Sequence, residues 1–397
     1  MKIAFICSSL EPGRDGVGDY TRRLAGELIR QGHSVVAVGL NEPNLAETLP
    51  EQQEIEGATI AVLRLASGSS WSRRVTETRD WLRTFNPDWL SLQFVPFGFH
   101  DKGLYFGLGK SLAAIKTKAS WHIMFHELWL GLGENAPFKH RVWGLLQRLI
   151  VWDFMGRLHP RIVHTQAESY RIALLRENLV ANILPLFSNI PRCPGDGWTG
   201  LLEPLVTAAA GKSQDRSQLY LAGVLGGVHP EWSAETTVNI LLPLVQRGHK
   251  RLVLVFLGKH NLTPEAVNQL KAALHSRAEV VFTGEKSAAD ISILLQALDL
   301  GLATTPRQII QKSGSAAAML EHGLQILVTR NDWQLRGLDA PLDDKSPRFL
   351  SPEQFAVLKN LPVRDQQPPG DCGLTRVAHQ LVAAMKSPVS AYRAKPS

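Results

Sequence analysis

The sequence is poor in cysteine: it has three among 397 residues, at positions 7, 193 and 372. Their spacing fits neither a disulfide framework nor a metal-binding motif, which indicates a reducing compartment. It also lacks an apolar run of the roughly 20 residues that cross a bilayer, and the hydrophobic region of a signal peptide is missing after Met1. These absences predict a cytoplasmic protein whose contact with a membrane is at most peripheral, at the inner face.

The length of 397 residues favours two domains, because single cores stop growing at roughly 250–300 residues. Hydrophobic residues make up 44% of the chain and charged residues 20%, as in ordinary globular proteins. The formal charge of +7 favours anionic partners such as nucleotides or acidic membrane surfaces. The chain contains no nucleic-acid-binding motif, so we expect no nucleic acid among its partners.

Short apolar runs alternate with amphipathic stretches in both halves, which is typical of parallel sheets with helices on both faces. Glycine, proline and polar residues interrupt this alternation near residue 200, as in a linker. The sequence therefore predicts an α/β protein with two doubly wound, Rossmann-like domains. The expected parts are a first domain over 1–190, a linker over 191–217, a second domain over 218–385 and a tail over 386–397.

A glycine-rich turn follows the first predicted strand. Gly16, Val17, Gly18, Asp19 and Tyr20 form a segment in which the two glycines allow the backbone to approach a ligand closely. A dinucleotide fingerprint would need a third glycine where Thr21 stands, so a nicotinamide or flavin site is not favoured. A tight strand-to-helix turn without a ligand explains the same residues.

His126 and Glu127 follow a predicted strand at its carboxyl end, the edge at which open α/β sheets bind ligands. A histidine there can contact a sugar hydroxyl or stabilise developing charge, with Glu127 orienting it. A histidine bonded only to a backbone carbonyl is the alternative. These two residues are the predicted catalytic pair.

In the second half, similar residues follow several predicted strands. Gly223 and Gly227 belong to a second glycine-rich turn, and Lys259 and Gly284 follow the next two strands. Further along the chain, a loop leads into a predicted helix. The free N–H groups and the dipole at the start of this helix suit a phosphate. The predicted donor-side residues of this loop and helix are Lys312, Ser313, Gly314, Ser315 and Glu321.

A further stretch, 139–161, mixes basic residues with tryptophans and other apolar side chains. Two interpretations stay open. A basic amphipathic helix of this kind can lie on an anionic membrane, and a core helix with an exposed basic face gives the same pattern.

Together these positions resemble the retaining GT-B glycosyltransferases, in particular glycosyltransferase family four. The resemblance covers residues 1–385 and implies two Rossmann-like domains that face each other across a cleft. It implies that Gly16–Tyr20 lie on the acceptor side, that His126 contacts the donor sugar, and that the 312–315 loop holds the donor diphosphate. It also implies transfer from a nucleotide-diphosphate sugar to a glycan or lipid-linked acceptor in polysaccharide biosynthesis, without a metal or other cofactor.

The chain departs from this family at two glutamates, whose places are taken by Ile310 and Ala318. The departure leaves open a second function, a catalytically inactive GT-B subunit that binds glycan or nucleotide in a polysaccharide assembly complex. A sugar epimerase or phosphorylase on the same fold is a third interpretation.

Overall fold

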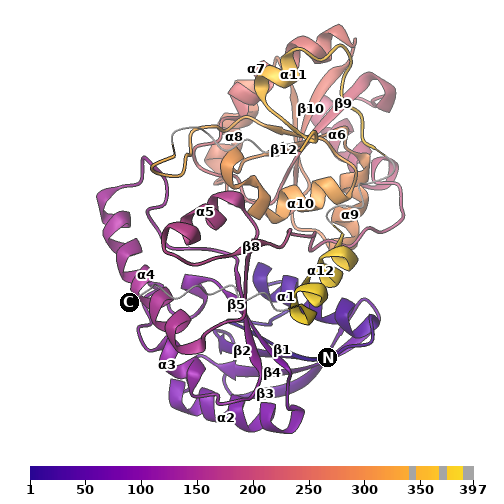
Figure 1. The fold of residues 1–397 in the computed structure, drawn as a ribbon. Helices are drawn as coiled ribbons and strands as arrows, with labels where there is room; N and C mark the ends of the chain where they lie inside the picture. The colour runs from indigo at the N-terminus through magenta and orange to yellow at the C-terminus, as the bar shows by residue number, and fades with distance from the viewer. Residues whose placement is uncertain (339–345, 366–372, 388–397) are drawn as a thin grey trace. The chain divides into compact units, whose positions relative to one another are not determined.

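The computed structural model describes residues 1–338, 346–365 and 373–387. The chain forms two compact units (Figure 1). Of the described residues, the first unit comprises 1–189, 334–338 and 374–387, and the second comprises 190–333, 346–365 and 373. The chain thus returns twice to the first unit after leaving it, which differs from the contiguous domains that the sequence predicts. Most of the predicted tail lies outside the described residues.

The first unit is built on an eight-stranded sheet with the order β3-β4-β2-β1-β5-β6-β7-β8. All its strand pairs are parallel except β3 with β4. The strands are β1 (Lys2–Cys7), β2 (Ser34–Glu42), β3 (Leu49–Ile55), β4 (Ala58–Ala66), β5 (Trp89–Phe94), β6 (Ser120–Phe125), β7 (Ile162–Thr165) and β8 (Asn182–Ile183). The helices are α1 (Gly16–Arg30), α2 (Trp71–Phe85), α3 (Leu108–Ala113), α4 (Phe138–Leu158), α5 (Glu168–Arg176) and α12 (Leu374–Lys386).

The second unit holds a six-stranded parallel sheet with the order β11-β10-β9-β12-β13-β14. Its strands are β9 (Leu219–Leu225), β10 (Arg251–Leu257), β11 (Glu279–Phe282), β12 (Leu300–Ala303), β13 (Ile326–Val328) and β14 (Phe349–Leu350). Its helices are α6 (Glu203–Ala210), α7 (Ala234–Arg247), α8 (Pro264–Leu274), α9 (Ala288–Ala297), α10 (Gly314–Glu321) and α11 (Pro352–Ala356). These parallel sheets confirm the predicted α/β class.

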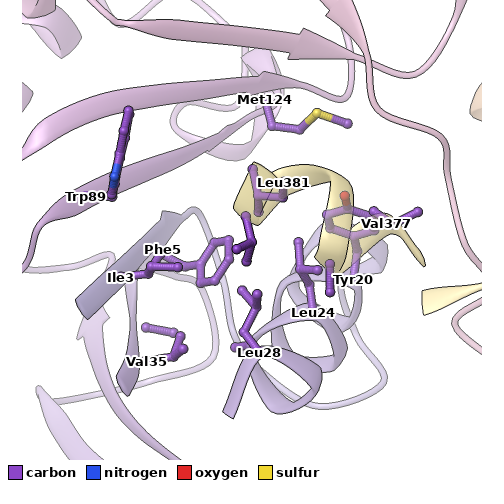
Figure 2. Packing of buried hydrophobic residues seen from close by; sticks show 14 of the residues in the cluster. Ile3, Phe5, Tyr20, Leu24, Leu28, Val35, Trp89, Met124, Val377 and Leu381 are labelled. Atoms are coloured by element: carbon purple, nitrogen blue, oxygen red, sulfur yellow. The ribbon is translucent and has the colours of Figure 1, made fainter. Parts of the chain in front are cut away.

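Helix α12 completes the core of the first unit. Its apolar residues Val377 and Leu381 are fully buried in one cluster with Leu24 and Leu28 of α1 and Phe5 of β1 (Figure 2). Each such side chain contributes roughly 1.5–3 kcal/mol when it leaves water. The sequence pattern predicts a last helix over Asp371–Met385, which α12 confirms from Leu374 on. The predicted domain bounds place this helix in the second domain, because its sequence neighbours belong there.

The predicted linker is also structured in part. A π-helix, Trp198–Leu202, runs into α6, and both Leu202 and Val206 are buried in the core of the second unit. Proline and glycine punctuate this segment, but its few apolar residues still pack on the sheet. Residues 198–210 are therefore part of the second domain.

Candidate functional site

Two groups of side chains, one in each unit, lie at the carboxyl ends of parallel strands, where ligands bind in open α/β sheets. The first group surrounds His126, which comes directly after β6. The second surrounds the start of α10, which follows β12. Each group is described within its own unit.

His126 is buried, and both its ring nitrogens are hydrogen-bonded. Its Nε2 lies 2.8 Å from Gln93 Oε1, and its Nδ1 lies 3.0 Å from Gln166 Nε2. These two amides, from β5 and from the residue after β7, orient the His126 ring. Burial lowers the pKa of His126 to about 3, so the ring is neutral near pH 7. A neutral ring cannot stabilise developing negative charge as an imidazolium would.

The contacts of His126 extend into a buried chain of polar groups across three strands. Gln93 Nε2 donates to Ser91 Oγ at 2.8 Å, and Ser91 Oγ lies 2.8 Å from His122 Nδ1. His122 Nε2 in turn lies 3.0 Å from His164 Nδ1. With the amides oriented as they are, His126 donates from Nε2 to Gln93 and accepts at Nδ1 from Gln166. The other contacts are satisfied when Ser91 donates to His122 and His122 donates to His164, so each histidine carries its proton on Nε2. These hydrogen bonds fix the tautomer of His126.

The buried histidines of this hydrogen-bonded group predict that acid lowers the stability of the first domain. Burial holds the pKa of His122 well below its usual value, and that of His164 at about 4. The unfolded chain therefore takes up protons below about pH 6.5 that the native protein does not. The free energy of unfolding should fall as the pH drops from about 6.5 toward 4, by roughly 1 kcal/mol per pH unit for each histidine.

Denaturant unfolding at a series of pH values measures this slope. The variant His164→Gln should show a shallower slope than the wild type, because one titrating group is gone. In the control, His379→Gln, an exposed histidine of α12 is replaced, and the slope should stay unchanged. Equal slopes in all three proteins would contradict the prediction.

The glycine-rich segment of the first unit is helical, not a loop. The spacing of apolar residues predicts a helix over Asp19–Arg30. Helix α1 begins three residues earlier, at Gly16, because Asp15 caps it by accepting a hydrogen bond from Gly18 N at 2.7 Å. Gly18 packs against the main chain of Ser9 and leaves no room for a side chain. Gly16 is exposed, Val17 is half-buried, and Asp19 accepts a hydrogen bond from Gly13 N at 3.0 Å.

Tyr20 connects this segment to His126. Its ring meets the His126 ring edge-on, with the centroids 4.8 Å apart, and stacks on Phe187 at 4.4 Å. Its hydroxyl is buried and has no hydrogen-bond partner among the described residues. Such a hydroxyl costs about 1–3 kcal/mol unless a ligand or water satisfies it. The structure thus brings the predicted acceptor segment and the predicted catalytic histidine together.

In the second unit, the start of α10 is tied to the turn after β9. Ser313 caps the helix by accepting a hydrogen bond from Ala316 N at 3.3 Å. Ser315 Oγ donates to the carbonyl of Leu225, the last residue of β9, at 2.9 Å. Gly314 is exposed, and a side chain there would meet no heavy atom within 4 Å. The helix therefore presents an accessible N-terminus next to a strand end.

Residues after the neighbouring strands belong to the same edge. Gly227 accepts a hydrogen bond from Thr304, which follows β12, at 3.3 Å. Gly258 N donates to Thr283 Oγ1 at 3.0 Å, which joins the strand ends next to Lys259 and Gly284. The structure brings these predicted residues to one edge of the sheet, where backbone N–H groups and lysines suit a diphosphate.

Two predicted donor residues lie elsewhere. Gly223 is inside β9, where its missing side chain leaves room for Leu298, so it belongs to the strand and not to the turn. Glu321 is the last residue of α10, about 10 Å along the axis from the start of the helix. Lys312, which the sequence places in a loop before the helix, is the last residue of the 3₁₀ helix Arg307–Lys312, just before α10.

Arg330 is a feature of this edge that the sequence analysis missed. It follows β13, is buried, and pairs with Glu231 and Asp332 while donating to the Thr304 carbonyl at 3.3 Å. Arginine is a good partner for phosphate because it bonds two oxygens at once. Its position directly after an apolar strand was the signal that could have identified it.

No protein-family profile matches the chain, and no curated protein sequence matches it. Solved structures do. An α,α-trehalose-phosphate synthase (UDP-forming) from Burkholderia xenovorans has a TM-score of 0.55 at 10% identity, with 98% of this chain and 100% of that chain covered. HepE from Anabaena, solved with UDP, has a TM-score of 0.53 at 13% identity, with 98% of this chain and 92% of that chain covered. A glycosyltransferase from Rickettsia africae has a TM-score of 0.53 at 13% identity, with 97% of each chain covered.

At these identities the similarity establishes the fold. The chain has the GT-B fold of two Rossmann-like α/β domains, as the sequence predicts. Among the described residues, none of the helices has the length and apolar character needed to cross a membrane.

Proposed function

We propose that this protein is a glycosyltransferase that moves a sugar from a nucleotide-diphosphate donor to a glycan or lipid-linked acceptor, with retention and without a metal. The observation that carries the proposal is the accessible start of α10, which Ser315 ties to the end of β9. Lys259 and Thr304 follow β10 and β12 at the same edge of the sheet. Free N–H groups, a helix dipole and an ammonium at one sheet edge suit the diphosphate that leaves during transfer.

The comparisons support this assignment. HepE was solved with UDP and with UDP-glucose, and the trehalose-phosphate synthase was solved with glucose-6-phosphate. These are the chemical classes that the proposal requires, a nucleotide-sugar donor and a sugar acceptor. In the proposed reaction, the α10 start and Lys259 stabilise the charge that builds up on the leaving diphosphate. The Gly16–Tyr20 segment and His126 contribute to the sugar and acceptor side.

A thermal-shift screen against UDP, GDP, ADP and their sugar conjugates tests donor binding. A nucleotide present at about 100 times its Kd adds about 3 kcal/mol to the stability of the folded protein, a shift of several degrees. We expect one nucleotide family to give this shift. The variant Gly314→Trp should lose it, since the new side chain fills the open space before α10 without an overlap.

The matched control is Gly200→Trp, which places the same side chain at another open, exposed position of the second unit. It should keep the shift. If no nucleotide stabilises the wild type, or if both variants lose the shift alike, the proposed donor site is wrong.

A second candidate, a GT-B subunit that binds ligand without turnover, is favoured by one observation. Ile310 and Ala318 stand where family four has its glutamates, and both are buried in the core of the second unit. The side chains at these places cannot hold a ribose. An assay for nucleotide release from the donor separates the candidates, because a binding subunit releases none with any acceptor.

A further inference from the structure

A cavity in the first unit is unusually rich in arginine. It has a volume of about 250 Å³ and lies between the loop after β6, the helices α4 and α5, and residues 335–336. Two of its arginines, Arg141 and Arg148, come from α4, and the others are Arg176 and Arg336. Glu177 is the one carboxylate in the lining, so the lining side chains carry a formal charge of +3.

The arginines are held in place without losing their charge. Arg148 pairs with Glu177, at 2.6 Å. The other three donate to main-chain carbonyls: Arg141 to Ala136 at 3.0 Å, Arg336 to Gly133 at 3.1 Å, and Arg176 to residues 336 and 337. Carbonyl oxygens orient a guanidinium but do not neutralise it. The result is a positively charged cavity whose guanidinium groups are held in place, and arginine is a favourable partner for phosphate.

Beside the cavity, α4 exposes a row of large apolar side chains. The row follows a spacing of four and three residues, which keeps it on one face of the helix. Its members and their exposed fractions are Phe138 (78%), Val142 (42%), Leu145 (50%), Leu149 (49%) and Trp152 (46%). We call these five residues the α4 stripe.

The stripe and the cavity are continuous. Leu145 belongs to both, and Arg141 and Arg148 lie on α4 just beside the stripe. The opposite face of the helix is already buried, through Ile150 and Phe154 among others. The stripe is therefore additional apolar surface, and a contiguous exposed patch of this kind marks an interaction site.

We propose that this surface binds an anionic lipid, with the phosphate headgroup in the arginine cavity and the α4 stripe among the acyl chains. A ligand that satisfies both features must join a phosphate to an apolar chain. A soluble sugar phosphate would leave the stripe in water. Charge complementarity supports the same occupant, since α4 carries Lys139 and Arg157 besides the cavity arginines, and one acidic residue, Asp153. The proposal does not depend on sugar transfer.

Vesicle flotation of the full chain tests the apolar half of the surface. The protein should bind vesicles of phosphatidylcholine mixed with phosphatidylglycerol and not vesicles of phosphatidylcholine alone. The double variant Leu149→Ser with Trp152→Ser should bind roughly tenfold more weakly or worse, because its apolar burial is lost. The control removes two exposed valines of the second unit, Val357→Ser with Val363→Ser, and should bind like the wild type.

A second pair of variants tests the cavity. Arg141→Gln with Arg336→Gln should weaken vesicle binding by about fivefold for each arginine. Arg73→Gln with Arg79→Gln removes the same charge from the exposed face of α2 and should have little effect. Unchanged thermal midpoints show that all variants are folded.

Three outcomes would overturn the proposal. Equal binding to both kinds of vesicle would show that the net negative charge of the headgroup is not recognised, because the phosphate of phosphatidylcholine is balanced by its choline. Equal losses of vesicle binding in the two arginine double variants would show that the cavity contributes only nonspecific charge attraction. Binding of glycerol phosphate without any binding to vesicles would make the ligand a soluble phosphate. The nucleotide thermal shift is measured separately, so failure here leaves the proposed transfer reaction intact, and the reverse also holds.

Discussion

Replacing Lys259 with methionine is expected to lower sugar transfer by about 10²–10³-fold while leaving the protein folded. Lys259 is exposed and follows β10 by two residues, at the sheet edge that also carries the start of α10. In the proposed reaction its ammonium stabilises the charge on the leaving diphosphate. That charge develops mainly in the transition state, so the loss should fall on kcat more than on KM.

The chain offers a matched control on the same strand. Lys250 directly precedes β10, at the opposite edge of the sheet, and the substitution Lys250→Met removes the same charge there. Its activity should equal that of the wild type. Steady-state kinetics with the donor identified by the thermal-shift screen make the comparison. A similar decrease in both variants would show that net charge, not position at the edge, is responsible.

Replacing Gly323 with alanine should lower the free energy of unfolding by about 3–5 kcal/mol. Gly323 ends α10 in a left-handed conformation with φ of +86°, and the next residue, Leu324, closes the turn by donating to the Met319 carbonyl at 3.0 Å. A Cβ at this position would overlap the carbonyl of Asp365, whose own N–H donates to Gly323 O at 2.8 Å. The segment around residue 365 would have to move away.

Gly211→Ala separates the two causes of this loss. Gly211 caps α6 with a similar φ of +70°, but a side chain there meets no atom within 4 Å. The control therefore carries the backbone strain without the overlap and should lose only about 1 kcal/mol. Denaturant unfolding measures both values. If both variants lose the same amount, the overlap with residue 365 is not the main term.

Much of the fold could be predicted because buried parallel strands are nearly continuous apolar runs. The sequence pattern predicts strands over Lys2–Cys7 and Trp89–Phe94 and a helix over Trp71–Phe85, and β1, β5 and α2 have these bounds. The edge strand β3 was missed, since Leu49-Pro50-Glu51-Gln52-Gln53 is mostly polar and contains proline. Its partner β4 supplies the pairing, and a polar edge strand leaves little signal in the sequence.

The site was predictable only in part, for a similar reason. The ends of strands identified Lys259, His126 and the start of α10 from local order alone. The partners of His126 could not be found in this way, because Gln93 and Gln166 come from neighbouring strands that are far away in the sequence. Pairings of this kind depend on the order of strands in the sheet, which local patterns do not carry.

The return of α12 to the first unit has a consequence for biosynthesis. Val377, Leu381 and Met385 pack into the same cluster as α1 and β1, so these elements share a core with residues that are synthesised more than 340 positions later. The second unit, by contrast, contains no part of α12. The part of α1 that packs on α12 therefore stays uncovered until the second unit has been synthesised. Apolar surface that is exposed during that interval favours aggregation of the nascent chain.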